Sequence, residues 1–194
     1  MDLEEYNIIQ ISFIVLWIMM PAYISNTIAV FTGGKYPIDQ GKLWSDGYRI
    51  LGDGKTWSGL IGGTVGGIGI GYFQLNWGES IIKSLTGELP EKIWGESPLV
   101  IFFLLAFGAL FGDMTASFFK RRNNLNRGDK SPILDMFDFI GMALFLTLLF
   151  GNGWLQSWIV DGIVPLFTLV VITPLLHRSV NILGFKLGIK NEPW

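Results

Sequence analysis

The sequence predicts an all-α fold: a polytopic integral membrane protein with about five transmembrane helices in a single domain, residues 1–194. Three observations lead to this prediction. Half of the 194 residues are hydrophobic and only 15% are charged, which is too apolar for an ordinary soluble domain. Five stretches approach the roughly 20 apolar residues that a membrane-spanning helix needs. The basic residues gather in a few connecting segments instead of being spread along the chain.

The five candidate spans cover residues 7–32, 57–76, 98–119, 132–150 and 155–183. The first follows an acidic start that lacks the basic region of a cleaved signal peptide, so we expect it to remain as a membrane anchor. The second is marginal because it is rich in glycine. The fourth begins after Ser131 with Pro132, and proline is favoured at the first position of a helix. The fifth contains Pro165 and Pro174, so we expect a kinked or broken helix there.

The basic residues predict how these spans are oriented. Twelve of the 14 Lys and Arg residues lie in segments 33–56 and 120–131 and in the C-terminal tail from residue 178. Five spans put these three segments on the same side of the membrane. Because basic connecting segments stay in the cytoplasm, we expect the N-terminus outside, the C-terminus inside, and cytoplasmic loops at 33–56 and 120–131. The expected location is therefore the cell membrane, with an active site at the cytoplasmic face.

Residues 59–73, GLIGGTVGGIGIGYF, look at first like a nucleotide-binding loop. However, Gly59, Gly63, Gly67 and Gly71 recur at every fourth position, and no Lys or Arg lies in the run. Small residues with this spacing line one face of a helix and let another transmembrane helix approach closely. The pattern therefore favours helix packing over ligand binding.

The segment GDGKT, residues 52–56, is not a P-loop, because Arg49 stands where that motif needs a glycine five residues before its Gly-Lys pair. The segment still places the carboxylate of Asp53 and the ammonium group of Lys55 on flexible backbone where the chain re-enters the membrane. Gly-Asp-Gly is also ordinary turn chemistry. The residues alone leave a ligand-binding role and a solvated turn as equal alternatives.

Acidic residues stand at the cytoplasmic ends of two predicted spans. Asp113, Ser117 and Lys120 are spaced at i, i+4 and i+7, which puts them on one helix face. Asp113 would lie about 10 Å deeper than Lys120 along the axis, and a carboxylate at such depth usually faces a polar cavity with a partner. Asp135 and Asp138 share a face near the start of the next helix. The helix dipole favours an acidic first turn, which accounts for Asp135 but not for Asp113.

Three carboxylates at one level suit a hard divalent cation such as Mg²⁺, which binds carboxylate and phosphate oxygens. The chain has no cysteine and only one histidine, His177, which excludes thiolate sites and a zinc site built on several histidines. The basic residues between the aspartates resemble phosphate ligands: Lys120, Arg121, Arg122, Arg127 and Lys130. Alternatively, these residues only obey the positive-inside rule or contact anionic lipid, which would not explain the flanking aspartates. The combination indicates phosphoryl or nucleotidyl transfer involving a lipid.

Several of these elements resemble the signature of the cytidylyltransferases that make CDP-diacylglycerol: Asp113, Ser117, Lys120-Arg121, Asp129-Lys130, and Asp135 with Asp138 in an Asp-x-x-Asp element. Over almost its full length the chain resembles a family of shorter archaeal membrane enzymes, the CDP-archaeol synthases. That resemblance rests on size, on five spans, and on three elements of the first loop: KYPID (35–39), WSDGYR (44–49) and GDGKTWSG (52–59).

The resemblance implies a reaction in which CTP and 2,3-bis-O-(geranylgeranyl)-sn-glycerol 1-phosphate give CDP-archaeol and pyrophosphate, with Mg²⁺. It implies that the metal ligands are Asp113, Asp135 and Asp138, which form the catalytic set together with Lys120. The residues implied to hold the phosphates of CTP or of the lipid are Ser117, Lys120, Arg121 and Lys130, while Asp53 and Lys55 help to bind the nucleotide. Asn26, inside the first span, either lines the same cavity or serves helix packing.

Other functions remain open from the residues. A CDP-diacylglycerol synthase acting on phosphatidic acid would share the same site chemistry. A membrane transporter would also carry intramembrane carboxylates and proline-broken helices, but near the bilayer midplane and often with an internal repeat. A lipid-binding scaffold leaves Asp113 unexplained. The expected partners are CTP, the isoprenoid glycerol phosphate and membrane lipids, without nucleic acid. The oligomeric state stays open, with a homodimer as one option.

Overall fold

The computed structural model describes residues 6–87, 93–125, 129, 131–157 and 162–188, with the main chain alone for 132–135 and 177. The regular elements in these residues are helices, and the only β-structure there consists of isolated bridges, so the all-α prediction is confirmed for the part described. The helices are α1 (Ile8–Thr32), α2 (Trp57–Asn76), α3 (Glu79–Thr86), α4 (Pro98–Arg122), α5 (Pro132–Phe150) and α6 (Ile163–Lys186).

Apolar helices dominate the described chain, as a membrane protein requires. Among the residues described, α1, α4 and α6 are long and apolar enough to cross a membrane, and α5 contributes a shorter apolar stretch, Met136–Phe150. Helix α2 coincides with the second predicted span, 57–76. Its many glycines give it a lower mean hydropathy than α1, α4 and α6.

The helix starts follow from local sequence. The side chain of Asn7 caps the first turn of α1. At α2, the hydroxyl of Thr56 accepts a hydrogen bond from the N–H of Gly59 at 3.1 Å. Helices α4 and α5 carry Pro98 and Pro132 at their first positions, where the missing N–H has no helical partner to lose. The predicted start of the fourth span is therefore confirmed.

The last predicted span, 155–183, is interrupted as expected: residues 154–157 are helical, 158–161 lie outside the described residues, and Gly162 is extended. Helix α6 starts at Ile163, directly after Gly162. Pro165 falls in its first turn, which a proline tolerates, while Pro174 lies inside the helix. The prolines thus do not break α6 itself.

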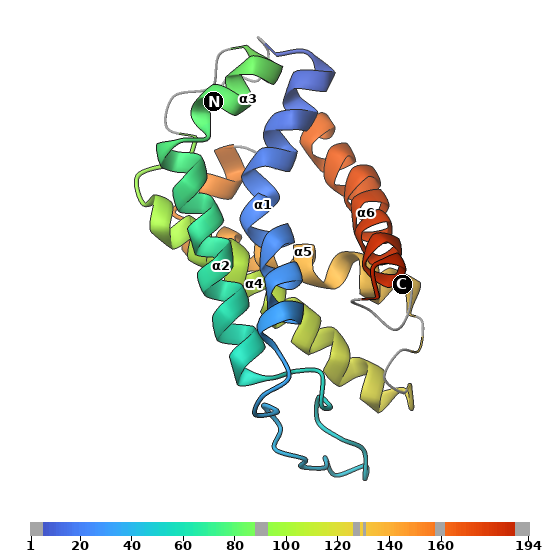
Figure 1. Cartoon of the computed structure of the whole chain (residues 1–194). Helices are drawn as coiled ribbons and strands as arrows, with labels where there is room; N and C mark the ends of the chain where they lie inside the picture. The colour runs from blue at the N-terminus through green and yellow to red at the C-terminus, as the bar shows by residue number, and fades with distance from the viewer. Residues whose placement is uncertain (1–5, 88–92, 126–128, 130, 158–161, 189–194) are drawn as a thin grey trace.

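Helix α1 lies at the centre of the bundle and packs most extensively on α2, then on α4 and α6, while α4 packs against α5 (Figure 1). The buried core contains Ile14 and Met19 of α1 together with Phe102 and Leu105 of α4. The start of α1 and helix α3 lie at one end of the bundle, and loop 33–56 projects from the opposite end (Figure 1). This arrangement brings the first loop to the C-terminal end of α4.

The glycine run packs as predicted. A Cβ atom added at Gly63 would lie 2.6 Å from the carbonyl oxygen of Ser25 in α1. One added at Gly67 would lie 2.5 Å from the Cβ of Ala106 in α4. Helix α2 therefore fits between α1 and α4 because these positions lack side chains. Gly69 differs, since a Cβ atom there would have nothing within 4 Å.

We expect Gly67→Ala to destabilise the protein by about 1–3 kcal/mol, because the added methyl group overpacks a tight helix contact. Its matched control is Gly69→Ala, which adds the same methyl group in open space. The control should be neutral, or stabilising by roughly 0.5–1 kcal/mol, because alanine favours a helix interior over glycine. Thermal unfolding of the two detergent-purified variants measures the difference. Equal destabilisation of both would contradict the packing role of the Gly67 face.

Candidate functional site

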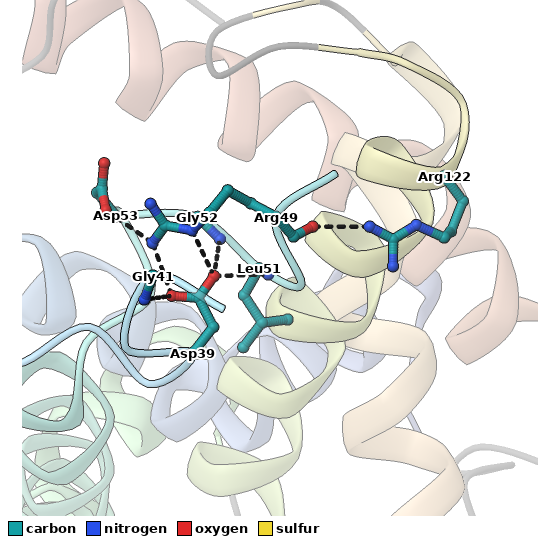
Figure 2. Close-up of polar contacts among 7 residues, drawn as sticks. All are labelled: Asp39, Gly41, Arg49, Leu51, Gly52, Asp53 and Arg122. Atoms are coloured by element: carbon teal, nitrogen blue, oxygen red, sulfur yellow. Dashed lines mark hydrogen bonds and ion pairs between the residues drawn. The ribbon is translucent and has the colours of Figure 1, made fainter. Parts of the chain in front are cut away.

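Loop 33–56 is organised around the buried carboxylate of Asp39 (Figure 2). The side chain of Asp39 is 0% exposed. The guanidinium group of Arg49 donates to both of its oxygens, from Nε at 3.0 Å and from Nη2 at 2.7 Å. The carboxylate also accepts hydrogen bonds from the main-chain N–H groups of Gly41, Leu51 and Gly52, at 3.2, 3.0 and 2.8 Å. A buried charge with this many donors is fully satisfied.

The charges of this cluster stabilise one another. The Arg49 side chain, and then the three main-chain donors, hold the pKa of Asp39 well below its usual range despite its burial. Nη2 of Arg49 also donates to Oδ1 of Asp53 at 2.8 Å. Asp39 first, and Asp53 second, raise the pKa of Arg49 above its already high usual value. Arg49 thus joins a buried carboxylate to Asp53, whose side chain is 67% exposed.

The GDGKT segment forms a turn that places the side chain of Lys55 against α4. Gly52 has a φ of +96°, which favours glycine, and its carbonyl oxygen accepts from the N–H of Lys55 at 3.2 Å. The carbonyl oxygen of Lys55 accepts from the N–H of Ile38 at 2.8 Å. The ammonium group of Lys55 pairs with Oδ2 of Asp113 in α4. The segment therefore forms the turn that was one of the two alternatives, while its ligand-binding role stays a prediction.

Arg122 fastens another part of the loop to α4. Its Nη2 donates to the carbonyl oxygen of Arg49 at 2.7 Å (Figure 2), and its Nε lies 2.6 Å from Oδ2 of Asp46. Its guanidinium group also lies over the ring of Phe118, 4.8 Å from the ring centroid, with the ring of Trp44 close by at 6.0 Å. Arg122 is therefore occupied in holding the loop, although the sequence grouped it with the phosphate ligands.

The other predicted residues of α4 lie on a continuous helix. Asp113, Ser117 and Lys120 share the expected face, and all three are partly buried. Arg121 lies under the turn of the loop, because a Cβ atom at Gly52 would come within 3.4 Å of its Nε. Arg121 also donates to the carbonyl oxygen of Leu125 from its Nη1. The basic last turn of α4 thus meets the charged turn of the first loop.

Helices α4 and α5 cross at small residues, and the crossing includes the main chain of Asp138 and the neighbour of Asp113. A Cβ atom at Gly112 would lie 2.2 Å from the carbonyl oxygen of Asp138, and one at Gly108 would lie 2.7 Å from Cα of Ala143. Asp113, next to Gly112, and Asp138 therefore belong to one helix crossing. Asp138 is partly buried, and its Oδ1 accepts from the N–H of Phe139 at 2.6 Å.

Some predicted site residues lie outside what the structure describes. Arg127 and Lys130 are outside the described residues, and Asp135 lies in the first turn of α5 without a described side chain. Within the side chains that are described, no group of three His, Asp or Glu residues lies close enough to hold a metal ion. The predicted three-carboxylate set therefore stays a prediction, with Asp113 and Asp138 at one crossing.

Asn26 lies in a different environment from the charged residues. It lines a pocket of about 610 Å³ between α1 and α6, whose walls are almost entirely apolar. Phe13 and Phe31 of α1 and Leu176 of α6 are among its lining residues. Phe139 also lines this pocket, so it reaches the residue that follows Asp138. Asn26 is thus a polar group in an apolar wall.

The sequence assigned no role to Asp39 and Arg49, which organise this site, and it gave Arg122 a different role from the one that the structure shows. Their contacts join positions far apart in the chain, and no spacing rule reveals them. The one available signal was that Asp39 and Arg49 end two of the loop elements quoted above, KYPID and WSDGYR.

Comparison with known proteins identifies the family. A family model described as CarS-like, CDP-archaeol synthase, matches residues 6–194. The chain is 46% identical over 176 residues to the CDP-archaeol synthase of Methanospirillum hungatei JF-1, which covers 91% of this chain and 100% of that relative. It is 44% identical over 179 residues to the CDP-archaeol synthase of Methanosarcina barkeri, with the same coverage of each chain.

A solved structure agrees with these relatives. It is described as an intramembrane enzyme for archaeal membrane lipids biosynthesis, and it resembles this chain with a TM-score of 0.62 and 32% sequence identity. The match covers 86% of this chain and 92% of the other. Because the family model spans nearly all of the sequence and the relatives are covered from end to end, the chain belongs to the CarS-like family of CDP-archaeol synthases.

Proposed function

We propose that this protein is a membrane cytidylyltransferase that transfers CMP from CTP to 2,3-bis-O-(geranylgeranyl)-sn-glycerol 1-phosphate. The products are pyrophosphate and CDP-archaeol. Family membership supports this activity. The observation that carries it is the contact between Lys55 of the first loop and Asp113 of α4, at the end of the bundle where basic side chains gather. A cationic loop, a pair of aspartates and an adjoining apolar pocket are the parts that a nucleotide and a lipid phosphate need.

The proposed topology has five spans, with the N-terminus outside and the site at the cytoplasmic face of the cell membrane. The apolar character of α1, α4, α5 and α6 supports it, and α2 lies along α1 through its glycines. Loop 33–56 and the basic end of α4 lie at one end of the bundle, and α3 lies at the other (Figure 1). The excess of Lys and Arg in segments 33–56 and 120–131 favours the cytoplasm for the first of these ends.

The carboxylates of Asp113 and Asp138 have the ligand chemistry that would suit a magnesium ion. The carboxylate of Asp113 already binds a cation, the ammonium group of Lys55. Mg²⁺ is usually held by one or two carboxylates and by substrate phosphates, so Asp113 and Asp138 would suffice, with Asp135 as the third proposed ligand. When bound, the ion would neutralise charge that develops on the reacting phosphates.

The remaining chemistry involves the phosphates of the two substrates and the basic side chains that would hold them. An oxygen of the lipid phosphate attacks the α-phosphorus of CTP, and the bond from that phosphorus to the pyrophosphate leaving group breaks. The second pKa of a phosphate monoester is about 6, so this nucleophile is largely ionised near neutral pH and needs no general base. Lys55 would hold phosphates of CTP, Lys120 and Arg121 would hold phosphates of either anionic substrate, and all three would offset the repulsion between the substrates. Ser117, Arg127 and Lys130 are further proposed phosphate ligands. Asp53 is proposed to help to bind the nucleotide.

The apolar pocket between α1 and α6 is the proposed place for the isoprenoid chains. Its walls are lined by side chains such as Leu16, Ile24 and Val180, which suit hydrocarbon. Because Phe139 lines it and Asp138 precedes Phe139, a lipid in this pocket would have its phosphate near the α4–α5 crossing. Asn26 then lies along the lipid and not beside the nucleotide.

We expect pyrophosphate release from CTP by the detergent-purified protein only when Mg²⁺ and the archaeal lipid phosphate are both present. Phosphatidic acid, offered in parallel, should react at least about tenfold more slowly if the pocket discriminates between the chains. Equal rates would mean that the enzyme also acts as a CDP-diacylglycerol synthase. If neither lipid leads to release of pyrophosphate, cytidylyl transfer would be contradicted. Membrane transport would then be the next function to test.

Replacing Asp113, Asp135 or Asp138 with Asn should lower kcat/KM by about a hundredfold or more, as losses of transition-state electrostatic contacts generally do. The same variants should need a higher Mg²⁺ concentration for half-maximal rate. A matched control is Glu79→Gln on α3, at the other end of the bundle, where Glu79 pairs with Lys83 at an exposed site. Full activity in any of the three Asn variants would remove that residue from the proposed metal set.

A further inference from the structure

A carboxylate with no exposed surface is unusual in a loop that projects from the end of a bundle. Asp39 is such a group, since its side chain is 0% exposed. Aspartate is almost never fully buried unless it is paired, because removing its charge from water is costly. At Asp39, five hydrogen bonds from four residues offset this desolvation cost. The loop therefore encloses the charge of Asp39. The positions of the hydrogen-bond donors show which part of the loop this carboxylate holds.

The donors hold the turn that carries Lys55. The N–H of Gly52 points to Oδ2 of Asp39, and the carbonyl oxygen of the same Gly52 accepts from the N–H of Lys55. On its other side, the carbonyl oxygen of Lys55 accepts from the N–H of Ile38, the neighbour of Asp39. The main chain of Lys55 is thus fastened on both sides to the immediate surroundings of Asp39.

The same carboxylate also acts on Asp53 through Arg49. Nη2 of Arg49 lies 2.7 Å from Asp39 and 2.8 Å from Asp53. Because the bidentate contact with Asp39 fixes the plane of the guanidinium group, it also fixes where Arg49 can meet Asp53. Asp39 therefore sets the position of two groups that are proposed to meet the nucleotide, while its own side chain has no exposed surface with which to meet a substrate.

A second set of contacts, made by Arg122, holds a neighbouring part of the loop. Arg122 binds the carbonyl oxygens of Tyr48 and Arg49 and the carboxylate of Asp46. These contacts fix the part of the loop from Trp44 to Arg49 on α4. None of these three contacts involves the main chain of Gly52 or Lys55. We therefore expect that loss of Asp46 loosens the loop without releasing the turn 52–55.

We propose that Asp39 is a positioning residue for CTP, which acts through the turn 52–55 to hold the ammonium group of Lys55 at Asp113. This inference rests on the proposed cytidylyl transfer. A residue that only stabilises the loop would weaken every function of the loop, with or without Lys55. A residue that acts through Lys55 loses its influence once the lysine side chain is gone.

A double-mutant cycle separates these two cases. Asp39→Asn, Lys55→Gln and the double variant are compared by KM for CTP and by Kd for a non-hydrolysable CTP analogue, measured by calorimetry with the full-length protein in detergent. Each single change should raise both constants by about tenfold, and the double variant should be no worse than Lys55→Gln alone, within about threefold. KM for the lipid phosphate should change less than about twofold, because the apolar pocket is untouched.

Two further variants keep the test decisive. Arg49→Lys retains the positive charge but lacks the planar fork, so it should reproduce the effect of Asp39→Asn if that variant fails to fold. Asp46→Asn is the matched control on the same loop, and its small effect should multiply with that of Lys55→Gln. Melting temperatures of all variants show whether each is folded.

Multiplicative effects of Asp39→Asn and Lys55→Gln would overturn the inference, as would normal CTP binding by a folded Asp39→Asn or Arg49→Lys variant. Both results would leave cytidylyl transfer by the wild-type protein intact. Wild-type protein that neither binds the CTP analogue nor releases pyrophosphate would remove the proposed function and this inference together.

Discussion

The close approach of α1 and α2 is the constraint on which the site depends. A Cβ atom at Gly59 would lie 3.1 Å from the carbonyl oxygen of Ala29 and 3.4 Å from Cα of Gly33, so the two ends of loop 33–56 are held almost in contact. Lys55 stands immediately before the cap of α2, and its position follows that of the helix. Because the same glycine-rich helix also packs on α4, one packing arrangement brings Lys55 within reach of Asp113.

Much of the fold could be predicted because membrane helices appear in a sequence as apolar runs with clear boundaries. Helices α2 and α5 have the predicted bounds, 57–76 and 132–150, since a cap or a proline marks each start. Helix α3 was not predicted. It is eight residues long and amphipathic, with Ile82 buried and its neighbour Ile81 exposed, and such a short element does not stand out from hydropathy alone.

The site was predictable where it follows helical spacing and unpredictable where it depends on tertiary contacts. Asp113, Ser117 and Lys120 share a face because 3.6 residues make a turn. Arg121 and Arg122 look equivalent in the sequence, but adjacent helical residues point about 100° apart, and only Arg122 reaches the carbonyl groups and Trp44 of the first loop. The contacts of Asp39 join a loop to itself, and a buried aspartate cannot be told from a solvated one by its neighbours in the chain.

If the apolar pocket between α1 and α6 holds the lipid, as proposed, the two substrates reach the enzyme from different phases. Helix α6 packs mainly on α1, and side chains from these two helices form most of the pocket wall. On the proposed assignment, CTP and pyrophosphate exchange with water, while the lipid and its activated product exchange sideways with the bilayer by two-dimensional diffusion. Such an enzyme responds to the mole fraction of its lipid in the leaflet and not to a bulk concentration. On that assignment its product would accumulate in the same layer that supplies its substrate, so the lipid composition of the membrane would influence the rate at which the lipid phosphate is activated.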